Sequence, residues 1–114
     1  MKYNNDFRYD LNIGQLKEKE LNEILSNSKI EVKYDLRALE TGNVFVEYES
    51  RGSPSGIAIT ESEWYCFAIG YTFHFIKTKV LMDRCRIYLK SNRDIVGGDE
   101  DTSKGILLPI IELF

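Results

Sequence analysis

The sequence predicts a single domain that mixes helices with strands, of the α/β or α+β class. The chain has 114 residues, which is the length of one domain with one core. Its residues are 43% hydrophobic and 29% charged, with two prolines, as in globular proteins. The spacing of the hydrophobic residues changes along the chain between the helical and the strand period. We therefore expect one domain over residues 1–114.

The first half of the chain predicts a helix followed by two strands. After an irregular lead-in over residues 1–12, leucines and isoleucines at helical spacing predict an amphipathic helix over Ile13–Leu25. Residues 30–35 alternate strictly between apolar and charged, so we expect a half-buried strand with Ile30, Val32 and Tyr34 on its buried face. A turn at residues 41–43 precedes a second strand over 44–49.

The second half predicts two helices and two strands. Thr60-Glu61-Ser62-Glu63 matches a capping box, which predicts a short helix that begins at Thr60 and includes the apolar run to Phe67. Aromatic residues then predict a strand over 71–76, and apolar spacing predicts a long helix over 77–89. Residues 106–111 predict a last strand, in which Pro109 favours an edge position.

Composition excludes several classes of protein. The net charge of -3 argues against a protein that coats nucleic acid. Cys66 and Cys85 are isolated, which excludes a zinc site, and the single His74 has no triad partners. The sequence contains neither a membrane-spanning apolar stretch nor a signal peptide, so we expect a cytoplasmic protein without a membrane partner.

The charges are unevenly distributed. Residues 31–63 carry seven acids and three bases, a net charge of -4, whereas residues 64–96 carry six bases and two acids, a net charge of +4. An acidic centre beside a basic segment suits a metal-dependent enzyme that acts on a polyanion. A domain with mixed surface charge fits the same counts.

Carboxylates near the ends of the two predicted strands are the candidate site. Asp35 ends the first strand, and Glu47 and Glu49 share one face of the second. If the strands are neighbours, these side chains converge on one spot, with Lys33 on the same face as Asp35. Carboxylate oxygens are the protein ligands that Mg²⁺ prefers.

These residues resemble the PD-(D/E)xK nuclease superfamily, which includes restriction endonucleases and archaeal Holliday-junction resolvases. The resemblance covers Gly14 to Glu18 on the first helix, then Asp35 and Glu47-Tyr48-Glu49, within residues 14–76 and the last strand. Residues 31–35, 41–52 and 54–57 are also similar to small uncharacterised nuclease-like proteins of bacteriophages. The resemblance implies a restriction-endonuclease-like fold: a helix, a three-stranded meander, a helix and a strand, with a mixed central sheet flanked by helices.

The resemblance also implies an activity, that of a metal-dependent DNA endonuclease that uses Mg²⁺ or Mn²⁺. Asp35 and Glu47 would bind the metal, and Glu18 would contribute directly or through water. Glu49 stands where the family has a lysine, so either Glu49 or Lys33 would orient the attacking water and offset charge. Two alternatives stay open within the motif: Glu20 in place of Glu18, and Glu31 paired with Lys33 as an E-x-K motif in another register.

Basic and hydroxyl side chains are expected to contact DNA. The candidates are Arg51 and Ser55 in the loop after the second strand, and Arg84 and Arg86 on the polar side of the long helix. One site per chain cuts one strand, so we expect a homodimer for double-strand breaks or junctions. The alternatives are a catalytically degenerate nuclease-fold protein that binds DNA, and a phage accessory protein whose acids keep it soluble. A phage-encoded protein would act in the host cytoplasm.

Overall fold

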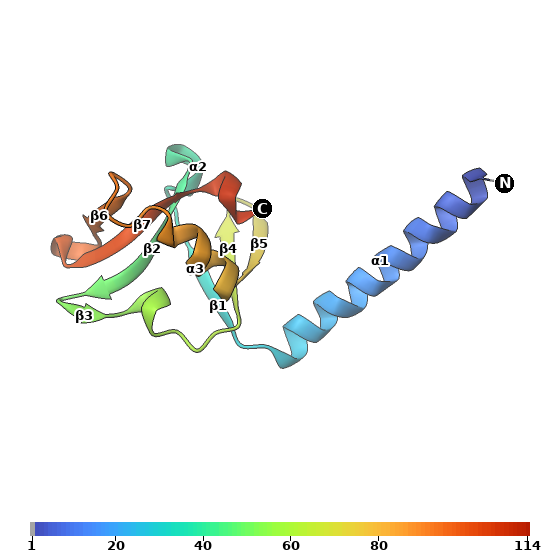
Figure 1. The fold of residues 1–114 in the computed structure, drawn as a ribbon, viewed down its shortest axis with the longest axis horizontal. Coiled ribbons are helices and arrows are strands. Elements are labelled where there is room, and N and C mark those ends of the chain that lie inside the picture. Colours follow the sequence, from blue (N-terminus) through green and yellow to red (C-terminus); the bar gives the residue numbers. More distant parts are fainter. Residues whose placement is uncertain (1) are drawn as a thin grey trace.

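The computed structural model describes residues 2–114, with side chains from Leu11 onward except that of Asp99. The predicted mixture of helices and strands is confirmed, and the class is α+β with mixed sheets. A long helix, α1 (Lys2–Asn27), extends away from a body that contains two small sheets (Figure 1). Because of this arm the molecule measures 61 × 29 × 26 Å.

The first sheet has three strands in the order β1-β4-β5. They are β1 (Ile30–Tyr34), β4 (Trp64–Ile69) and β5 (Thr72–Lys77), with β1 parallel to β4 and β4 antiparallel to β5. The short helix expected from Thr60 is therefore wrong. Aromatic side chains in the run from Trp64 to Phe67 favour a strand, and both neighbours supply backbone partners for it.

The second sheet is antiparallel, with four strands in the order β3-β2-β7-β6. They are β3 (Ser53–Pro54), β2 (Asn43–Ser50), β7 (Ser103–Pro109) and β6 (Asp94–Gly97). The last strand thus lies inside the sheet, and the expected edge position is wrong. Pro109 is tolerated because it is the final residue of β7, where a missing N–H interrupts no ladder.

The two strands that were expected to be neighbours lie in different sheets. β2 pairs with β3 and β7, whereas β1 pairs with β4, so the three-stranded meander is wrong. The connection is too structured for a hairpin: it forms a short helix, α2 (Ala38–Thr41), which ends at Gly42 in the left-handed conformation. Ala38 is fully buried, which anchors this turn to the core.

One hydrophobic core joins both sheets to α3 (Thr78–Arg86). Its most buried large side chains are Val44, Tyr65, Leu81, Ile106 and Leu108, which come from β2, β4, α3 and β7. Three short 3-10 turns complete the described chain, η1 (Gly56–Ala58), η2 (Asp99–Asp101) and η3 (Ile110–Leu113). The helix α3 is shorter than the range 77–89 expected from spacing.

The chain outside this core is more exposed than the sequence predicts. β1 is not half buried on its apolar face, because Val32 is 62% and Tyr34 67% exposed. The helix α1 is longer than the expected range and replaces the irregular lead-in from residue 2 onward; Met1 lies outside the described residues. Among the described residues, no helix is long and apolar enough to cross a membrane.

Candidate functional site

The predicted carboxylates do not converge in the structure. Glu18 is exposed on the arm α1, while Asp35 follows β1 and Glu47 and Glu49 lie on β2. Within the described residues, no group of three or more acidic, histidine or cysteine side chains is placed to hold a metal ion. The cause is the sheet topology, since β1 and β2 are not paired strands.

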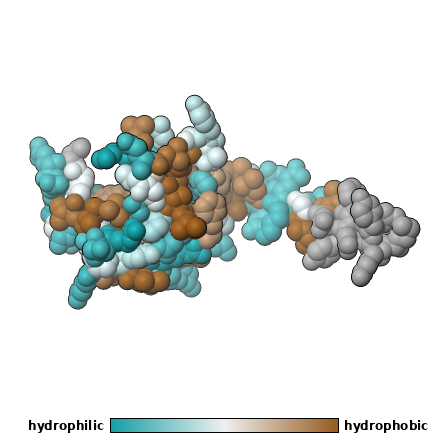
Figure 2. Space-filling view, turned by 90° about the horizontal axis from the view of Figure 1, so that it is seen from above, coloured by the Kyte–Doolittle hydropathy of each residue, from teal (hydrophilic) through white to brown (hydrophobic). Residues whose placement is uncertain are grey.

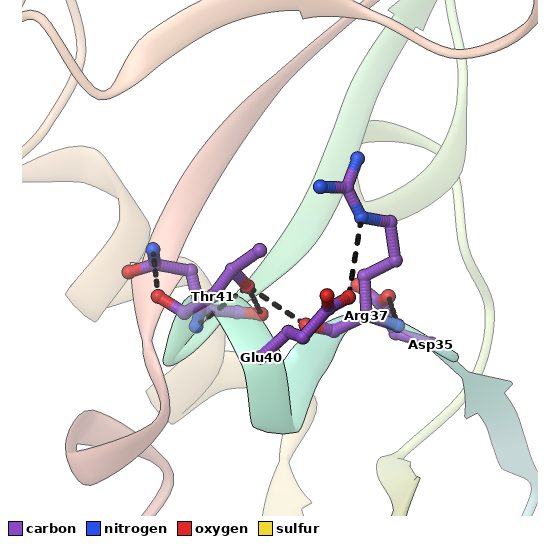
Figure 3. Close-up of polar contacts among 5 residues, drawn as sticks. Asp35, Arg37, Glu40 and Thr41 are labelled. Atoms are coloured by element: carbon purple, nitrogen blue, oxygen red, sulfur yellow. Dashed lines mark hydrogen bonds and ion pairs between the residues drawn. The ribbon is translucent and has the colours of Figure 1, made fainter.

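Asp35 is engaged in the turn between β1 and α2. Its carboxylate accepts a hydrogen bond of 2.9 Å from the backbone N–H of Arg37 (Figure 3). In the same turn, Arg37 is 3.8 Å from Glu40, and the Thr41 hydroxyl donates to the backbone oxygen of Arg37 at 3.1 Å. This pattern is an Asx turn that caps the connection, so turn geometry accounts for an acid at this position.

Glu49 has a different partner from Glu47. Its carboxylate lies 3.6 Å from the ammonium group of Lys104 on the neighbouring strand β7. Between Glu47 and Glu49 the register of β2 against β7 shifts, which marks a β-bulge. A bulge breaks the alternation that would otherwise put both carboxylates on one face.

An open cleft of about 480 Å³ gathers three of the charged residues from the two sheets. Glu31 and Lys33 come from β1, and Glu47 comes from β2. The loop around η1 and the residues before β4 form the remaining wall, which includes Gly56 and Thr60. The volume lies in the range of small-molecule sites in proteins.

Hydroxyl groups and Lys33 hold Glu47 in its charged form. The Ser55 hydroxyl donates to the Glu47 carboxylate at 2.9 Å. Ser103 on β7 has the largest effect and lowers the pKa of Glu47, and Ser55 and the charge of Lys33 lower it further, against the opposing effect of burial. An ionised carboxylate in this position attracts a cation.

Glu31 occupies the other side of the same cleft. Its carboxylate accepts a hydrogen bond of 3.3 Å from Thr60 and lies 3.6 Å from the ammonium group of Lys33. Lys33 therefore acts on both Glu31 and Glu47. The E-x-K alternative, with Glu31 and Lys33 as the motif, is the arrangement that the structure brings together with Glu47.

A smaller cavity of about 200 Å³ adjoins the cleft, and Tyr65 contributes to its lining together with Lys33 and Glu47. The Tyr65 hydroxyl is buried, and the Thr60 side chain interacts with it. Burial raises the pKa of Tyr65, so the phenol stays protonated and keeps its hydrogen available. A buried hydroxyl of this kind is ready to donate to a bound group.

Of the four residues predicted to contact DNA, only one interacts with a described residue of the cleft. Ser55 lies in the site through its bond to Glu47, and Arg51 is exposed in the tight turn between β2 and β3 with a left-handed backbone. Arg84 instead donates to the backbone carbonyls of Glu112 and Phe114 near the chain end. Arg86 lies 3.3 Å from Asp83 on its own helix.

Several residues that line the cleft are not among the predicted site residues, including Lys29 and Thr60. Lys29, just before β1, lines the cleft and lies 3.5 Å from Glu61. Thr60 was assigned to a helix cap, yet its hydroxyl bonds to Glu31 and also accepts from the backbone N–H of Ser62 at 3.1 Å. Only Thr60 carried a signal in the sequence, because a threonine in a loop before a strand often accepts a hydrogen bond from a backbone N–H two residues later.

The donor types in the cleft fit a magnesium or manganese ion only in part. Mg²⁺ commonly uses one or two protein carboxylates and completes its octahedron with water and substrate phosphate oxygens. Glu31 and Glu47 supply two such carboxylates on one cleft. The larger predicted set with Glu18 and Asp35 is not assembled around it.

Comparison with known proteins adds no identity. No family model, curated protein or solved structure matches the chain.

Proposed function

We propose that this protein is a metal-dependent DNA endonuclease whose active site is the cleft between β1 and β2. The observation that supports it most is that two carboxylates, Glu31 and Glu47, line one open polar cleft together with Lys33. Hard oxygen donors that can hold a metal ion, with a lysine beside them, suit phosphodiester hydrolysis. DNA is proposed as the substrate because basic side chains, Lys29 and Lys33, line the cleft beside the carboxylates and suit a phosphate polymer.

In this proposal Glu31 and Glu47 hold the Mg²⁺ or Mn²⁺ ion. When bound, the ion supplies positive charge at the phosphate and lowers the pKa of a bound water. Lys33 offsets the charge that develops on the phosphate oxygens. Ser55 and Thr60 fix the directions of the two carboxylates through their hydrogen bonds. No catalytic role is assigned to Glu18, Asp35 or Glu49.

In this proposal individual basic side chains at and near the cleft contact the polyanion. Lys29 lines the cleft, and Arg51 is exposed at the turn after β2. We further propose a homodimer, because one site per chain cuts one strand of a duplex. The place of action would be the cytoplasm, and the host cytoplasm if the protein is encoded by a phage.

The proposal is tested by incubating the protein with supercoiled plasmid, single-stranded DNA and a four-way junction, with Mg²⁺, Mn²⁺ or a chelator. We expect cutting that depends on the metal, that Glu31→Gln abolishes, and that Asp35→Ala retains because Asp35 serves the turn. Metal-independent cutting, or no cutting of any substrate, would contradict the proposal. Loss of cutting in Asp35→Ala with its fold intact would return the site to the predicted Asp35 arrangement.

A second candidate is a catalytically degenerate nuclease-fold protein that binds DNA. It is favoured by the absence of a three-ligand metal group among the described residues. Calorimetric titration separates the two candidates. The degenerate protein binds DNA equally with and without Mn²⁺, whereas the enzyme binds Mn²⁺ with an affinity that Glu47→Gln lowers.

A further inference from the structure

We infer that α1 is a dimerisation helix, which pairs antiparallel with α1 of a second copy of this chain. The helix has 26 residues and is about 39 Å long at 1.5 Å per residue. Every residue from Leu11 to Glu23 is exposed in the single chain. Helices in proteins owe most of their stability to packing of an apolar face, and isolated ones are marginal in water. A partner that packs against the exposed side of α1 would therefore stabilise the helix.

Three exposed leucines of α1 lie at positions that fit the repeat of a coiled coil. Leu11, Gly14, Glu18, Leu21 and Leu25 succeed one another by three and four residues in turn. This is the a/d repeat of two heptads, and it places all five on one seam of the helix. We call these five residues the α1 seam. Its leucines are 53%, 43% and 55% exposed in chain order.

Hydrophobic side chains are visible along the helix among hydrophilic ones in Figure 2. The helix extends from the body as an arm (Figure 1). Only its last turns approach the body, where Glu23, Ile24 and Asn27 line a hollow with Trp64 and Lys77. The seam is therefore available along the length that a partner helix needs.

A second copy of α1 complements the seam in one particular register. When the two helices run antiparallel, Leu11 packs against the partner's Leu21, and Glu18 lies against the partner's Gly14. Glycine has no side chain, so it leaves room for the carboxylate of Glu18. The partner's Lys17, beside the seam, then supplies the opposite charge.

A parallel pair in register is disfavoured by charge. It would set Glu18 against the partner's Glu18, and two like charges in one seam repel each other. It would also set Gly14 against the partner's Gly14 and leave a gap between the helices. The antiparallel register offsets the two Glu18 side chains by four residues, about 6 Å along the helix, and sets each against a glycine.

The length of the helix sets the size of the interface. A standard protein interface engages roughly 20–30 residues on each side. About half of the 26 residues of α1 would face the partner in such a pair, which makes an interface smaller than the standard one. This inference rests on the homodimer of the proposed function and on no other part of it. Its test contains neither DNA nor metal, so helix pairing and nuclease activity can fail separately.

The test is sedimentation equilibrium of the full chain. We expect a dimer for the wild type and a monomer for Leu21→Glu/Leu25→Glu, whose changes lie on an exposed helix outside the core. Leu16→Glu is the matched control: Leu16 is 62% exposed and lies roughly 140° around the helix from Leu11 and Leu21. The control should remain a dimer. A monomeric or trimeric wild type, a dimeric seam variant, or a monomeric control overturns the inference.

Disulfide cross-linking tests the antiparallel register. Leu11→Cys/Leu21→Cys should form covalent dimers on mild oxidation, whereas the single variants Leu11→Cys and Leu21→Cys should not. Within one chain, positions 11 and 21 are about 15 Å apart along the helix, too far for an internal disulfide. The native thiols of Cys66 and Cys85 are buried and do not compete. Cross-linking of either single variant would instead show a parallel pair.

Discussion

The Ser55 hydroxyl donates a hydrogen bond of 2.9 Å to the carboxylate of Glu47. The two residues are eight positions apart, and the contact joins the loop after β3 to the middle of β2. Ser55 was expected to bind DNA and Glu47 to bind a metal. Their direct contact gives Ser55 a positioning role, which keeps the Glu47 carboxylate directed toward the cleft.

The ionisation of Glu47 should depend on the hydroxyls around it. Ser103 has the largest effect in lowering the pKa of Glu47, followed by Ser55 and Lys33 on the same side. We expect Ser103→Ala to raise this pKa, and Lys33→Met to raise it less. Carbon-detected NMR titration of the side-chain carboxyl measures the shift. Equal pKa values in the wild type and Ser103→Ala would contradict this account.

The same carboxylate gives a stability prediction with a defined sign. Because folding lowers the pKa of Glu47, its contribution is present above the unfolded value of 4.5 and is lost as the pH falls through the folded value. The free energy of unfolding of the wild type relative to Glu47→Gln should therefore decrease below about pH 4.5. Urea unfolding at pH 6 and at lower pH values checks the direction, and an increase on acidification would contradict it.

Gly56 supports the cleft through its missing side chain. Its φ is +52°, and a Cβ there would lie 2.3 Å from the backbone oxygen of Glu47. We expect Gly56→Ala to lower the free energy of unfolding by about 2–4 kcal/mol, since backbone strain and a backbone clash add. Gly52→Ala is the matched control, with φ +80° but no atom within 4 Å of its Cβ. Chemical denaturation should show a clearly smaller loss for Gly52→Ala, and equal losses would contradict the clash.

Part of the structure followed from sequence patterns and part depended on contacts between distant segments. The strands at β2 and β5 and the helix at α3 carry strong local periodicity, and the structure has them within a few residues. The run from Trp64 to Phe67 was assigned to a helix because its capping box is a local signal. Its pairing with both β1 and β5 is a non-local one. Whether such a run forms a helix or a strand depends on the order of the strands in the sheet. The local spacing of residues carries no information about that order.

The candidate site shows the same division. Glu47 and Lys33, predicted as a metal ligand and as the residue that orients the attacking water, both line the cleft. Asp35 and Glu49 were grouped with them on the assumption that β1 and β2 pair. That assumption is wrong, because β1 and β2 lie in separate sheets and β2 has a bulge after Glu47. Thr60 and Lys29 enter the cleft from segments whose positions only the fold determines.

Tyr48 links β2 to β6 through a hydrogen bond that depends on pH. Its hydroxyl donates to Asp94 at 2.6 Å, and this bond raises the pKa of Tyr48 to about 12. Because folding raises this pKa, the stabilisation is complete below the unfolded value of 10.0 and is lost as the pH rises through the folded value. We expect Tyr48→Phe to cost about 1–2 kcal/mol at pH 7.

Urea unfolding of the wild type and Tyr48→Phe at several pH values isolates this bond, because the other tyrosines are common to both proteins. The difference in unfolding free energy should be constant up to about pH 10 and should then shrink toward pH 12. A difference that stays constant to pH 12 would show that the Tyr48 hydroxyl does not contribute through Asp94.

The measurement that tests the central claim most directly is the initial rate of Mn²⁺-dependent plasmid nicking by Glu47→Gln and Glu49→Gln. The two glutamates are two residues apart on β2, but Glu47 lines the cleft and Glu49 lies against Lys104. We expect Glu47→Gln to lose at least about 100-fold in rate and Glu49→Gln to cut close to the wild-type rate. Equal rates for Glu47→Gln and the wild type, or a loss confined to Glu49→Gln, would contradict the assignment of the active site to this cleft.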